Sequence, residues 1–254
     1  MSSGQRQPIL RRLVALDLAA DEEDARRLIE ERVVLVQGSL VDNPSRLVAT
    51  GDAITIVRPD EFVSRGGIKL SHALDHFHIN PAGRVALDIG ASTGGFTDCL
   101  LQRGARQVYS LDVGATQLHE RLKADGRVVV VDDFNARDLV DPLRCESRGL
   151  PLGFDIVVVD VSFISVVSLA ASIARVASTG ADVVVLVKPQ FEATKAEADK
   201  GAGVILDEAI HERVIDEVVR ACAAVGLGNL GLIESPIKGA SGNTEFLAHF
   251  RMTT

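Results

Sequence analysis

The chain has 254 residues, enough for a large domain with its own core and a small second domain. Its formal net charge of −8 excludes a generally basic nucleic-acid-binding protein, so contact with RNA would have to come from local basic patches. The three cysteines are odd in number and widely spaced, which excludes a disulfide scaffold and favours a reducing cytoplasm. The sequence has no run of 18 apolar residues and no apolar signal-peptide core, so we expect a cytoplasmic protein without a membrane segment.

The first part of the chain is predicted to form a small α+β domain. Apolar residues recur at helical spacing over 9–16 and 24–31, and acidic residues precede the second segment, as suits a helix N-terminus. Residues 33–41 predict two short strands, and residues 53–57 predict a third. Two helices and a small sheet are therefore expected within residues 1–58.

A linker at residues 59–63 is expected to connect this domain to a larger one at residues 64–254. The larger domain begins with the segment 64–77, which turns from a pair of glycines into a predicted helix. Lys69 falls just inside its first turn, where the helix dipole disfavours a cation, although a lysine there is most often a solvated surface residue. The apolar side of this helix is expected to consist of Ile68, Leu70, Ala73, Leu74 and Phe77.

From Val85 onward, strand and helix patterns alternate. Strands are expected at 85–89, 107–112, 127–131, 155–160 and 182–187, and helices at 94–103, 116–123, 164–177 and 207–225. This alternation predicts a parallel sheet with helices on both faces. The segments 228–235 and 245–251 leave no room for a helix between them and must pair antiparallel. The expected fold class is α/β: a Rossmann-like methyltransferase arrangement with a mostly parallel seven-stranded sheet and an antiparallel last strand, preceded by the small α+β domain.

The segment Val85–Leu101 predicts a strand, a Gly/Ser/Thr turn and a helix, which together admit a nucleotide-like ligand. Gly90, Gly94 and Gly95 permit backbone angles closed to other residues and let a ligand approach the main chain. The helix after them points free N–H groups toward that ligand. Such a turn alone serves NAD, FAD, nucleosides and S-adenosylmethionine alike.

Two later strand ends narrow the choice of cofactor. Asp112 follows Gly90 by 22 residues and ends the second strand, where a carboxylate can accept both ribose hydroxyls, which also fits NAD. Residues 132–135 end the third strand with a polar and aromatic set that suits an adenine, although Asp132 and Asp133 also fit ordinary turn chemistry. With the closing antiparallel strands, these features favour S-adenosylmethionine. The residues expected to bind it are Asp88, Gly90, Ala91, Ser92, Thr93, Gly94, Gly95, Phe96, Asp112, Val113, Asp132, Asp133, Phe134, Asn135 and Asp160.

Three charged residues are expected to meet outside the carboxyl ends of the strands, where ligands bind in such sheets. Asp160 ends the fourth strand, Lys188 ends the fifth, and Glu245 begins the antiparallel last strand at the same edge. A salt bridge between Lys188 and Asp160 is the simplest interpretation. The helix that carries Lys69 leads into the central strand, however, and two ammonium groups close together disfavour each other's protonation. One lysine could then take a proton from a hydroxyl, and this chemistry requires no metal.

Five motifs of the sequence occur together: Val63-Ser-Arg-Gly-Gly-Ile-Lys-Leu70, Gly90-Ala-Ser-Thr-Gly-Gly-Phe96, Asp160-Val-Ser-Phe-Ile-Ser165, Lys188-Pro-Gln-Phe-Glu192 and Ser241-Gly-Asn-Thr-Glu245. In combination they resemble the TlyA (hemolysin A) family, in which a ribosomal-protein-S-four-type RNA-binding domain is fused to an FtsJ-like (RrmJ-like) methyltransferase domain. The resemblance implies methyl transfer from S-adenosylmethionine to a ribose 2′-hydroxyl of ribosomal RNA, on cytidines for the better-known members. It also implies a catalytic tetrad of Lys69, Asp160, Lys188 and Glu245.

The S-four-type resemblance rests on the order of elements in the small domain and implies that its basic residues contact RNA. The arginines available for phosphate contact are Arg11, Arg12, Arg26, Arg27 and Arg32, with Arg65 in the larger domain. Ala20-Asp-Glu-Glu-Asp24 replaces the Ser-Arg pair usual in that family, and residues 1–60 carry eight Arg and no Lys against ten Asp or Glu. The alternative is a docking or dimerising domain that has lost its RNA.

Three functions fit these observations, although the sequence indicates neither the target nucleotide nor the oligomeric state. The first is a ribosomal RNA 2′-O-methyltransferase with Lys188 as the proton acceptor, and with ribosomal RNA or ribosomal subunits as partners. The second is a methyltransferase of the same fold that acts on a small molecule or another nucleic acid, which the net charge favours. The third is a non-catalytic RNA-binding or assembly factor. No amphipathic basic helix that would lyse a membrane is found.

Overall fold

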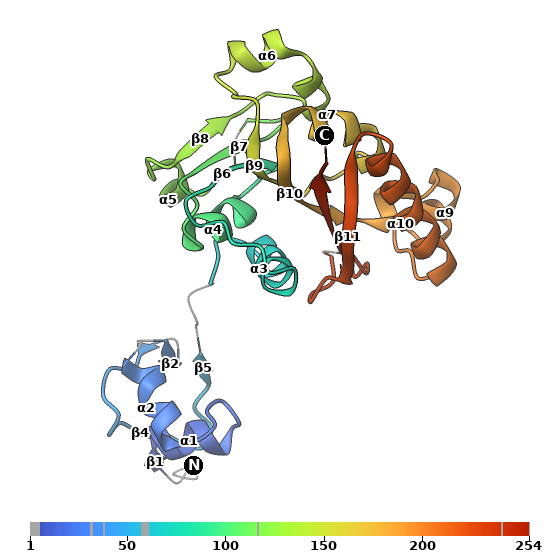
Figure 1. The fold of residues 1–254 in the computed structure, drawn as a ribbon. Coiled ribbons are helices and arrows are strands. Elements are labelled where there is room, and N and C mark those ends of the chain that lie inside the picture. Colours follow the sequence, from blue (N-terminus) through green and yellow to red (C-terminus); the bar gives the residue numbers. More distant parts are fainter. Residues whose placement is uncertain are drawn as a thin grey trace. The chain divides into compact units, whose positions relative to one another are not determined.

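The computed structural model describes residues 6–30, 33–37, 39–56, 61–115, 117–239 and 241–253. The chain divides into two compact units, Met1–Glu61 and Phe62–Thr254 (Figure 1), and each has its own buried apolar clusters. Arg32, one of the arginines expected to contact RNA, lies outside the described residues.

The first unit combines two helices with short strands. Its elements are β1 (Arg6–Pro8), α1 (Ile9–Ala15), α2 (Glu22–Glu30), β2 (Val34–Val36), β3 (Ser39–Leu40), β4 (Leu47–Ala49) and β5 (Ile54–Ile56). Both helices and the β2, β3 and β5 strands were expected, and Ile9, Leu13 and Leu28 pack with Val34 in one apolar cluster. The antiparallel pair of β1 and β4 was not expected, because strands of three residues are too short to show an alternating pattern.

The second unit is built on a seven-stranded sheet. Its strands are β6 (Val85–Ile89), β7 (Gln107–Leu111), β8 (Val128–Val131), β9 (Phe154–Val159), β10 (Ala177–Val187), β11 (Leu227–Glu234) and β12 (Phe246–Met252). They lie in the order β11-β12-β10-β9-β6-β7-β8, and β12 runs antiparallel between β10 and β11. The expected fold class is thereby confirmed.

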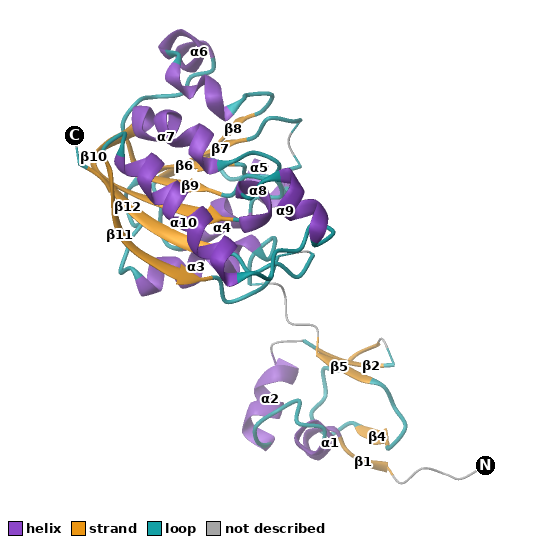
Figure 2. Ribbon diagram, turned by 90° about the vertical axis from the view of Figure 1, so that its right-hand side faces the viewer, coloured by secondary structure: helices purple, strands orange, loops and turns teal. Residues whose placement is uncertain are grey.

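Helices cover both faces of this sheet (Figure 2). They are α3 (Gly66–His76), α4 (Gly95–Gln102), α5 (Glu120–Lys123), η1 (Ala136–Val140), α6 (Pro142–Ser147), η2 (Val166–Leu169), α7 (Ala170–Val176), α8 (Pro189–Glu192), α9 (Lys195–Lys200) and α10 (Glu208–Ala223). Along β9, Ile156 and Val158 join the apolar cluster of α3 and α4, whereas Val157 and Val159 join the cluster of α7 and α10. In the described part of the chain, no helix is long and apolar enough to cross a membrane.

Three local expectations were wrong. The helix expected at 116–123 is limited to α5, since residues 117–119 form a loop in which His119 caps the helix. The helix expected at 164–177 is divided into η2 and α7, and β10 begins at Ala177, five residues earlier than expected. Ile68 is exposed rather than part of the buried side of α3.

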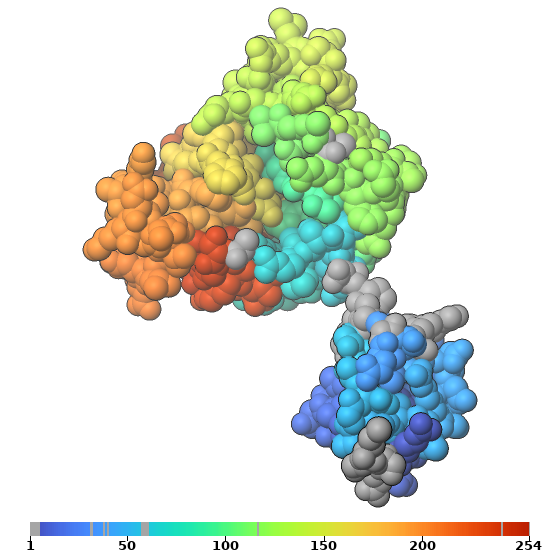
Figure 3. Space-filling view, turned by 180° about the vertical axis from the view of Figure 1, so that it is seen from behind, coloured from blue at the N-terminus to red at the C-terminus, as the bar shows by residue number. Residues whose placement is uncertain are grey.

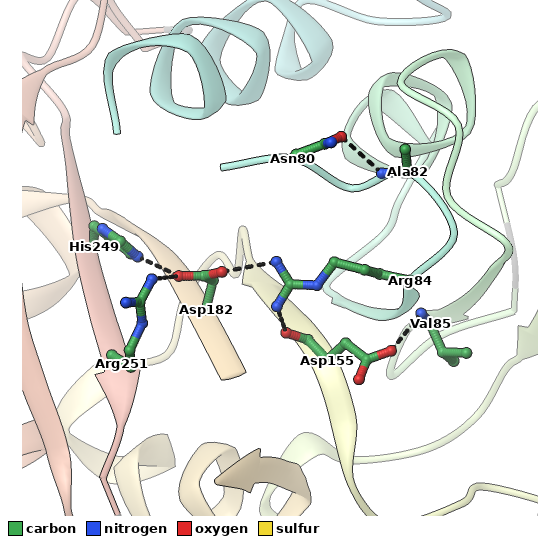
Figure 4. A network of polar contacts seen from close by, with 8 residues as sticks. All are labelled: Asn80, Ala82, Arg84, Val85, Asp155, Asp182, His249 and Arg251. Carbon is green, nitrogen blue, oxygen red and sulfur yellow. Dashed lines mark hydrogen bonds and ion pairs between the residues drawn. The ribbon is translucent and has the colours of Figure 1, made fainter. Parts of the chain in front are cut away.

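At the amino ends of the strands, a buried carboxylate joins several elements (Figure 4). Asp182 of β10 accepts hydrogen bonds from His249 Nε2 (2.9 Å) and Arg251 Nη2 (2.7 Å) of β12, and from Arg84 Nη1 (2.8 Å). Arg84 also donates to the carbonyl oxygen of Asp155 at the start of β9. Asp182 lies midway along β10, six residues before Lys188.

Candidate active site

The four tetrad residues lie at the carboxyl edge of the parallel strands. Asp160 directly follows β9, Lys188 directly follows β10, and Glu245 directly precedes β12, in which Phe246 pairs with Val187. Lys69 is the fourth residue of α3. All four line one cavity of about 620 Å³. Figure 3 shows the chain segments that carry them next to one another on one face of the second unit.

The lysines are held by different carboxylates. Lys69 Nζ donates to Glu245 Oε2 at 2.5 Å, and both side chains are buried. Lys188 Nζ lies 2.7 Å from Asp160 Oδ1, an ion pair without hydrogen-bond geometry, and donates to Ser162 Oγ at 3.1 Å. The simple salt bridge expected between Lys188 and Asp160 is therefore present, inside a cavity that also contains a second lysine.

The glycine turn forms another wall of this cavity. Gly90 has φ = +86°, and a Cβ atom there would lie 2.4 Å from the carbonyl oxygen of Asp160. A Cβ atom on Gly95 would lie 2.2 Å from Ser64 Oγ. The turn can therefore pack against the backbone of Asp160 and against Ser64, just before α3, only if these two positions are glycine. Its residues on the cavity wall are Gly90, Ala91, Ser92, Thr93, Gly95 and Phe96.

A second cavity, of about 520 Å³, shares Gly90, Ser92 and Asp160 with the first; the first is called the tetrad cavity below, and the second the cofactor cavity. Of the residues expected to bind the cofactor, Asp112, Val113, Phe134 and Asn135 line it as well. Asp112 Oδ2 accepts the Ser92 N–H (2.9 Å) and its Oδ1 accepts the Gly114 N–H (3.2 Å). These bonds fix the carboxylate at the end of β7, where each oxygen can also accept a ribose hydroxyl.

Four of the expected cofactor residues line neither cavity. Asp88 is fully buried in β6, and burial raises its pKa to about 7. The hydrogen bond from Thr97 Oγ1 (2.7 Å) opposes this shift, whereas the negative charge of Asp160 adds to it. Asp132 is partly buried, with an Oδ1 atom that has no hydrogen-bond partner. Gly94 directly precedes α4 and lies close to Leu118 and Leu122, and Asp133 is exposed.

The residues present fit S-adenosylmethionine. The turn has no Cβ atom at Gly90, so a ligand can approach its main chain, and the Asp112 carboxylate lies on the wall of the second cavity. The apolar part of the second cavity comes from Leu111, Phe134 and Leu169.

The arginines expected to contact RNA are distributed over both units. In the first unit, Arg11 pairs with Glu22 (3.4 Å), Arg12 donates to the Thr50 carbonyl (2.7 Å), Arg27 pairs with Asp24, and Arg26 is exposed. In the second unit, exposed Arg65 precedes α3 and lines the tetrad cavity.

Sequence reasoning missed several residues of the tetrad cavity. Phe163, whose side chain is 91% exposed, lines both cavities. The others on the tetrad cavity include Ser64, Gln190, Phe191, Ser241 and Asn243. All six residues named here belong to the five motifs of the sequence. Their position in the same motif as a tetrad residue was the signal that could have identified them as part of the site.

Comparisons with known proteins agree with this geometry. A family model described as FtsJ-like methyltransferase matches residues 62–252. The chain is 40% identical over 226 residues to hemolysin A of Brachyspira hyodysenteriae, covering 89% of this chain and 92% of that protein. It is 41% identical over 244 residues to the 16S/23S rRNA (cytidine-2′-O)-methyltransferase TlyA of Mycobacterium tuberculosis, covering 95% of this chain and 88% of that protein. A solved structure of a hemolysin-named protein from Streptococcus thermophilus matches with a TM-score of 0.71 at 35% identity, over 98% of this chain and 89% of that chain.

The sheet order and the two adjoining cavities define a Rossmann-like methyltransferase that uses S-adenosylmethionine. The chain belongs to the FtsJ-like methyltransferase family, among relatives named hemolysin A and TlyA. The family predicted from the five motifs is thereby confirmed.

Proposed function

We propose that the protein methylates the 2′-hydroxyl of a ribose in ribosomal RNA, with a cytidine as the target nucleotide. The observation that carries the proposal is the pair of lysine–carboxylate contacts in one cavity beside the cofactor cavity. A hydroxyl is a weak nucleophile, and a site for its methylation needs a base and fixed charges around it. The relatives named as rRNA (cytidine-2′-O)-methyltransferases supply the substrate class and the target base.

In the proposed mechanism, unprotonated Lys188 accepts the proton of the 2′-hydroxyl. Asp160, whose Oδ1 lies 2.7 Å from Lys188 Nζ, would hold the ammonium that results. Lys69, fixed by Glu245, places a positive charge beside the oxygen as it becomes negative. When bound, S-adenosylmethionine would supply a methyl group on a positively charged sulfur, so that the ribose oxygen gains the methyl group as the carbon–sulfur bond breaks and S-adenosylhomocysteine leaves.

The turn at residues 90–96 and Asp112 would hold the cofactor. Gly90 lets the ligand approach the main chain, and the N–H groups at the start of α4 face its polar end. Asp112 would accept the ribose hydroxyls, and Phe134 would pack against the adenine.

Two features of the cavity mouth suit RNA. Phe163 exposes 91% of its side chain there, and an exposed aromatic ring can stack on an unpaired base. Arg65, also at the cavity, can contact a phosphate. The small first unit, with its S-four-type order of elements, would add further contacts to RNA in the cytoplasm.

The experiment that tests this proposal is methylation of separated small and large ribosomal subunits with labelled cofactor, followed by mass spectrometry of the nucleosides. We expect a ribose-methylated cytidine with the wild type. Lys188→Ala should lower the rate by at least about 100-fold, since general-base catalysis contributes roughly 10²–10⁴-fold. Binding of the cofactor should be unchanged within about twofold, because Lys188 does not line the cofactor cavity.

The absence of any ribose-methylated nucleotide would contradict the proposal. The net charge of −8 favours one other function, a methyltransferase for a small molecule. Activity on a free metabolite, together with no retention on RNA at low salt, would support that alternative.

A further inference from the structure

Glu192 is a part-buried carboxylate that lines neither cavity. It is the last residue of α8, the short helix that begins directly after Lys188. Its side chain reaches the loop that leads from Asp160 to η2. Glu192 therefore connects the two segments that follow the catalytic strand ends.

Both oxygens of this carboxylate accept hydrogen bonds from that loop. Ser165 Oγ donates to Oε2 at 2.5 Å, and the Val166 N–H donates to Oε1 at 2.8 Å. Ser165 Oγ in turn accepts the Val167 N–H at 3.2 Å, so the first turn of η2 is fastened to Glu192. Burial raises the pKa of Glu192, and the donors from Ser165 and Val166 oppose this shift, which means that the charged form is stabilised by the loop.

The bond to Glu192 is one of three contacts that hold the loop 160–165. β9 and β10 are neighbouring parallel strands, and the Lys188–Asp160 ion pair joins their ends. Further along, the rings of Phe163 and Phe191 lie 5.1 Å apart. Glu192 closes the far end, so the loop 160–165 is held against residues 188–192 at three points.

Phe163, within the loop 160–165, has a backbone conformation that its surroundings must stabilise. Phe163 has φ = +64°, a left-handed backbone conformation that a bulky residue adopts only where its surroundings enforce it. The loop is bonded to Glu192 two residues after Phe163. If that bond were lost, Phe163 could relax toward an ordinary conformation and change the position of Asp160.

We propose that Glu192 is a positioning residue for methyl transfer. It fixes the loop 160–165 so that Asp160 stays beside Lys188 and Phe163 stays at the mouth of the cavity. The activity readout of this inference rests on the proposed function, whereas its structural readout does not.

Three variants and one control test the inference. Glu192→Ala loses both acceptors, Glu192→Gln keeps one carbonyl oxygen, and Ser165→Ala removes the hydroxyl but keeps the Val166 N–H. Glu212→Gln is the matched control, because it neutralises an exposed carboxylate on α10. Each variant is compared with the wild type at a temperature below its melting temperature.

The first measurement is the single-turnover rate of RNA methylation at saturating RNA and cofactor. We expect a loss of at least about 10-fold for Glu192→Ala and about 3-fold for Glu192→Gln and Ser165→Ala, since small displacements of catalytic groups cost large factors in rate. The loss in the double variant Glu192→Ala/Ser165→Ala should be smaller than the product of the two single losses, because both changes break the bond between Ser165 and Glu192. Glu212→Gln should match the wild type.

The second measurement is amide hydrogen exchange over residues 160–167. Exchange should become faster in Glu192→Ala and Glu192→Gln but not in Glu212→Gln, because only the first two lose bonds to the loop. If Glu192→Ala does not fold, both measurements are made on Glu192→Gln and Ser165→Ala instead.

A folded Glu192→Ala variant with unchanged exchange in this segment would overturn the inference. A rate within about twofold of the wild type, or additive losses in the double variant, would overturn it as well. If the wild type itself methylates no ribosomal RNA, the proposed function fails, and the exchange measurement still decides whether Glu192 holds the loop.

Discussion

At the scale of single residues, the two lysines of the candidate site differ in how firmly they are held. Lys69 and Glu245 form a buried hydrogen-bonded pair, in which Glu245 exposes only 4% of its side chain. Lys188 faces Asp160, which exposes 23% and leaves its nearest oxygen without a hydrogen bond. Lys188 is thus paired with a more exposed carboxylate than Lys69 is, and for this reason the proposed mechanism assigns Lys188 as the proton acceptor.

Asp88 is the buried titratable residue beneath the glycine turn. Its Oδ2 accepts the Thr97 hydroxyl, which also contacts Ser110 Oγ at 2.7 Å, whereas its Oδ1 has no hydrogen-bond partner. Burial raises its pKa to about 7. In the unfolded chain an aspartate titrates near 4, so between pH 4 and 7 the folded protein holds a proton that the unfolded chain releases.

We therefore predict that Asp88 lowers the stability of the protein as the pH rises from about 4 to 7, with the full cost present above pH 7. Asp88→Asn should raise the free energy of unfolding at pH 8, by up to about 4 kcal/mol if the whole shift is recovered. The gain should shrink toward pH 5. Urea unfolding at several pH values checks this, with exposed Asp133→Asn as the control, and parallel stability curves for Asp88→Asn and the wild type would contradict it.

At the scale of secondary structure, the sheet could be predicted because its central strands are buried on both faces. β6 and β9 are apolar except for one aspartate each and are bounded by turn residues, and their ends were predicted to within one residue. The helices α8 and α9 were not predicted. They have four and six residues, too few to show helical spacing, and are set by local features such as Pro189 at the first helical position and the capping box of Thr194.

The candidate site was predictable to the extent that strand ends determine it. Asp160, Lys188 and Glu245 were placed together by strand order alone, since neighbouring strand ends meet at one edge. Lys69 was added only by the family resemblance. Its contact with Glu245 joins residues 176 positions apart through the packing of α3 on the sheet, and no spacing in the sequence encodes that approach.

The Asp182 network fastens the amino ends of the strands, far along the sheet from the catalytic edge (Figure 4). Burial alone would raise the pKa of Asp182, but hydrogen bonds from His249, Arg251 and Arg84 outweigh it and hold the pKa well below its usual range. A carboxylate of this kind stabilises the fold above its unfolded pKa, near 4, and the contribution is lost as the pH falls below that value.

We predict that Asp182→Asn lowers the free energy of unfolding at pH 7 by up to about 3 kcal/mol, because His249, Arg84 and Arg251 lose their charged hydrogen-bond acceptor. The difference from the wild type should disappear at acidic pH. Affinity for S-adenosylmethionine should stay within about twofold, since no residue of the network lines the cofactor cavity. Urea unfolding and cofactor titration measure the two quantities. Glu234→Gln, which breaks an exposed pair with Lys238, should cost at most about 1 kcal/mol. Equal losses in the two variants would refute this view of the network.

At the scale of the whole molecule, the protein and its proposed substrate, ribosomal RNA, are both negatively charged. The chain carries a net charge of −8, and residues 1–60 carry eight Arg against ten Asp or Glu. Long-range attraction to RNA is therefore absent, and binding would depend on a few arginines in contact with phosphates. In the first unit, Arg11 has only a long exposed pair with Glu22, and Arg26 is exposed, so these two side chains can turn toward RNA at little cost.

We predict that Arg11→Glu/Arg26→Glu raises the KM for ribosomal RNA by at least about 10-fold, since two phosphate contacts become two repulsions. The dependence of RNA binding on salt should become weaker by roughly one to two ions in the slope of log K against log salt. Cofactor affinity should not change, because neither arginine lines the cofactor cavity. The control is Arg220→Glu/Arg213→Glu on α10, which alters the net charge equally. If the control raises the KM as much, RNA responds to net charge alone. If neither pair does so, the first unit is a docking domain that does not bind this substrate.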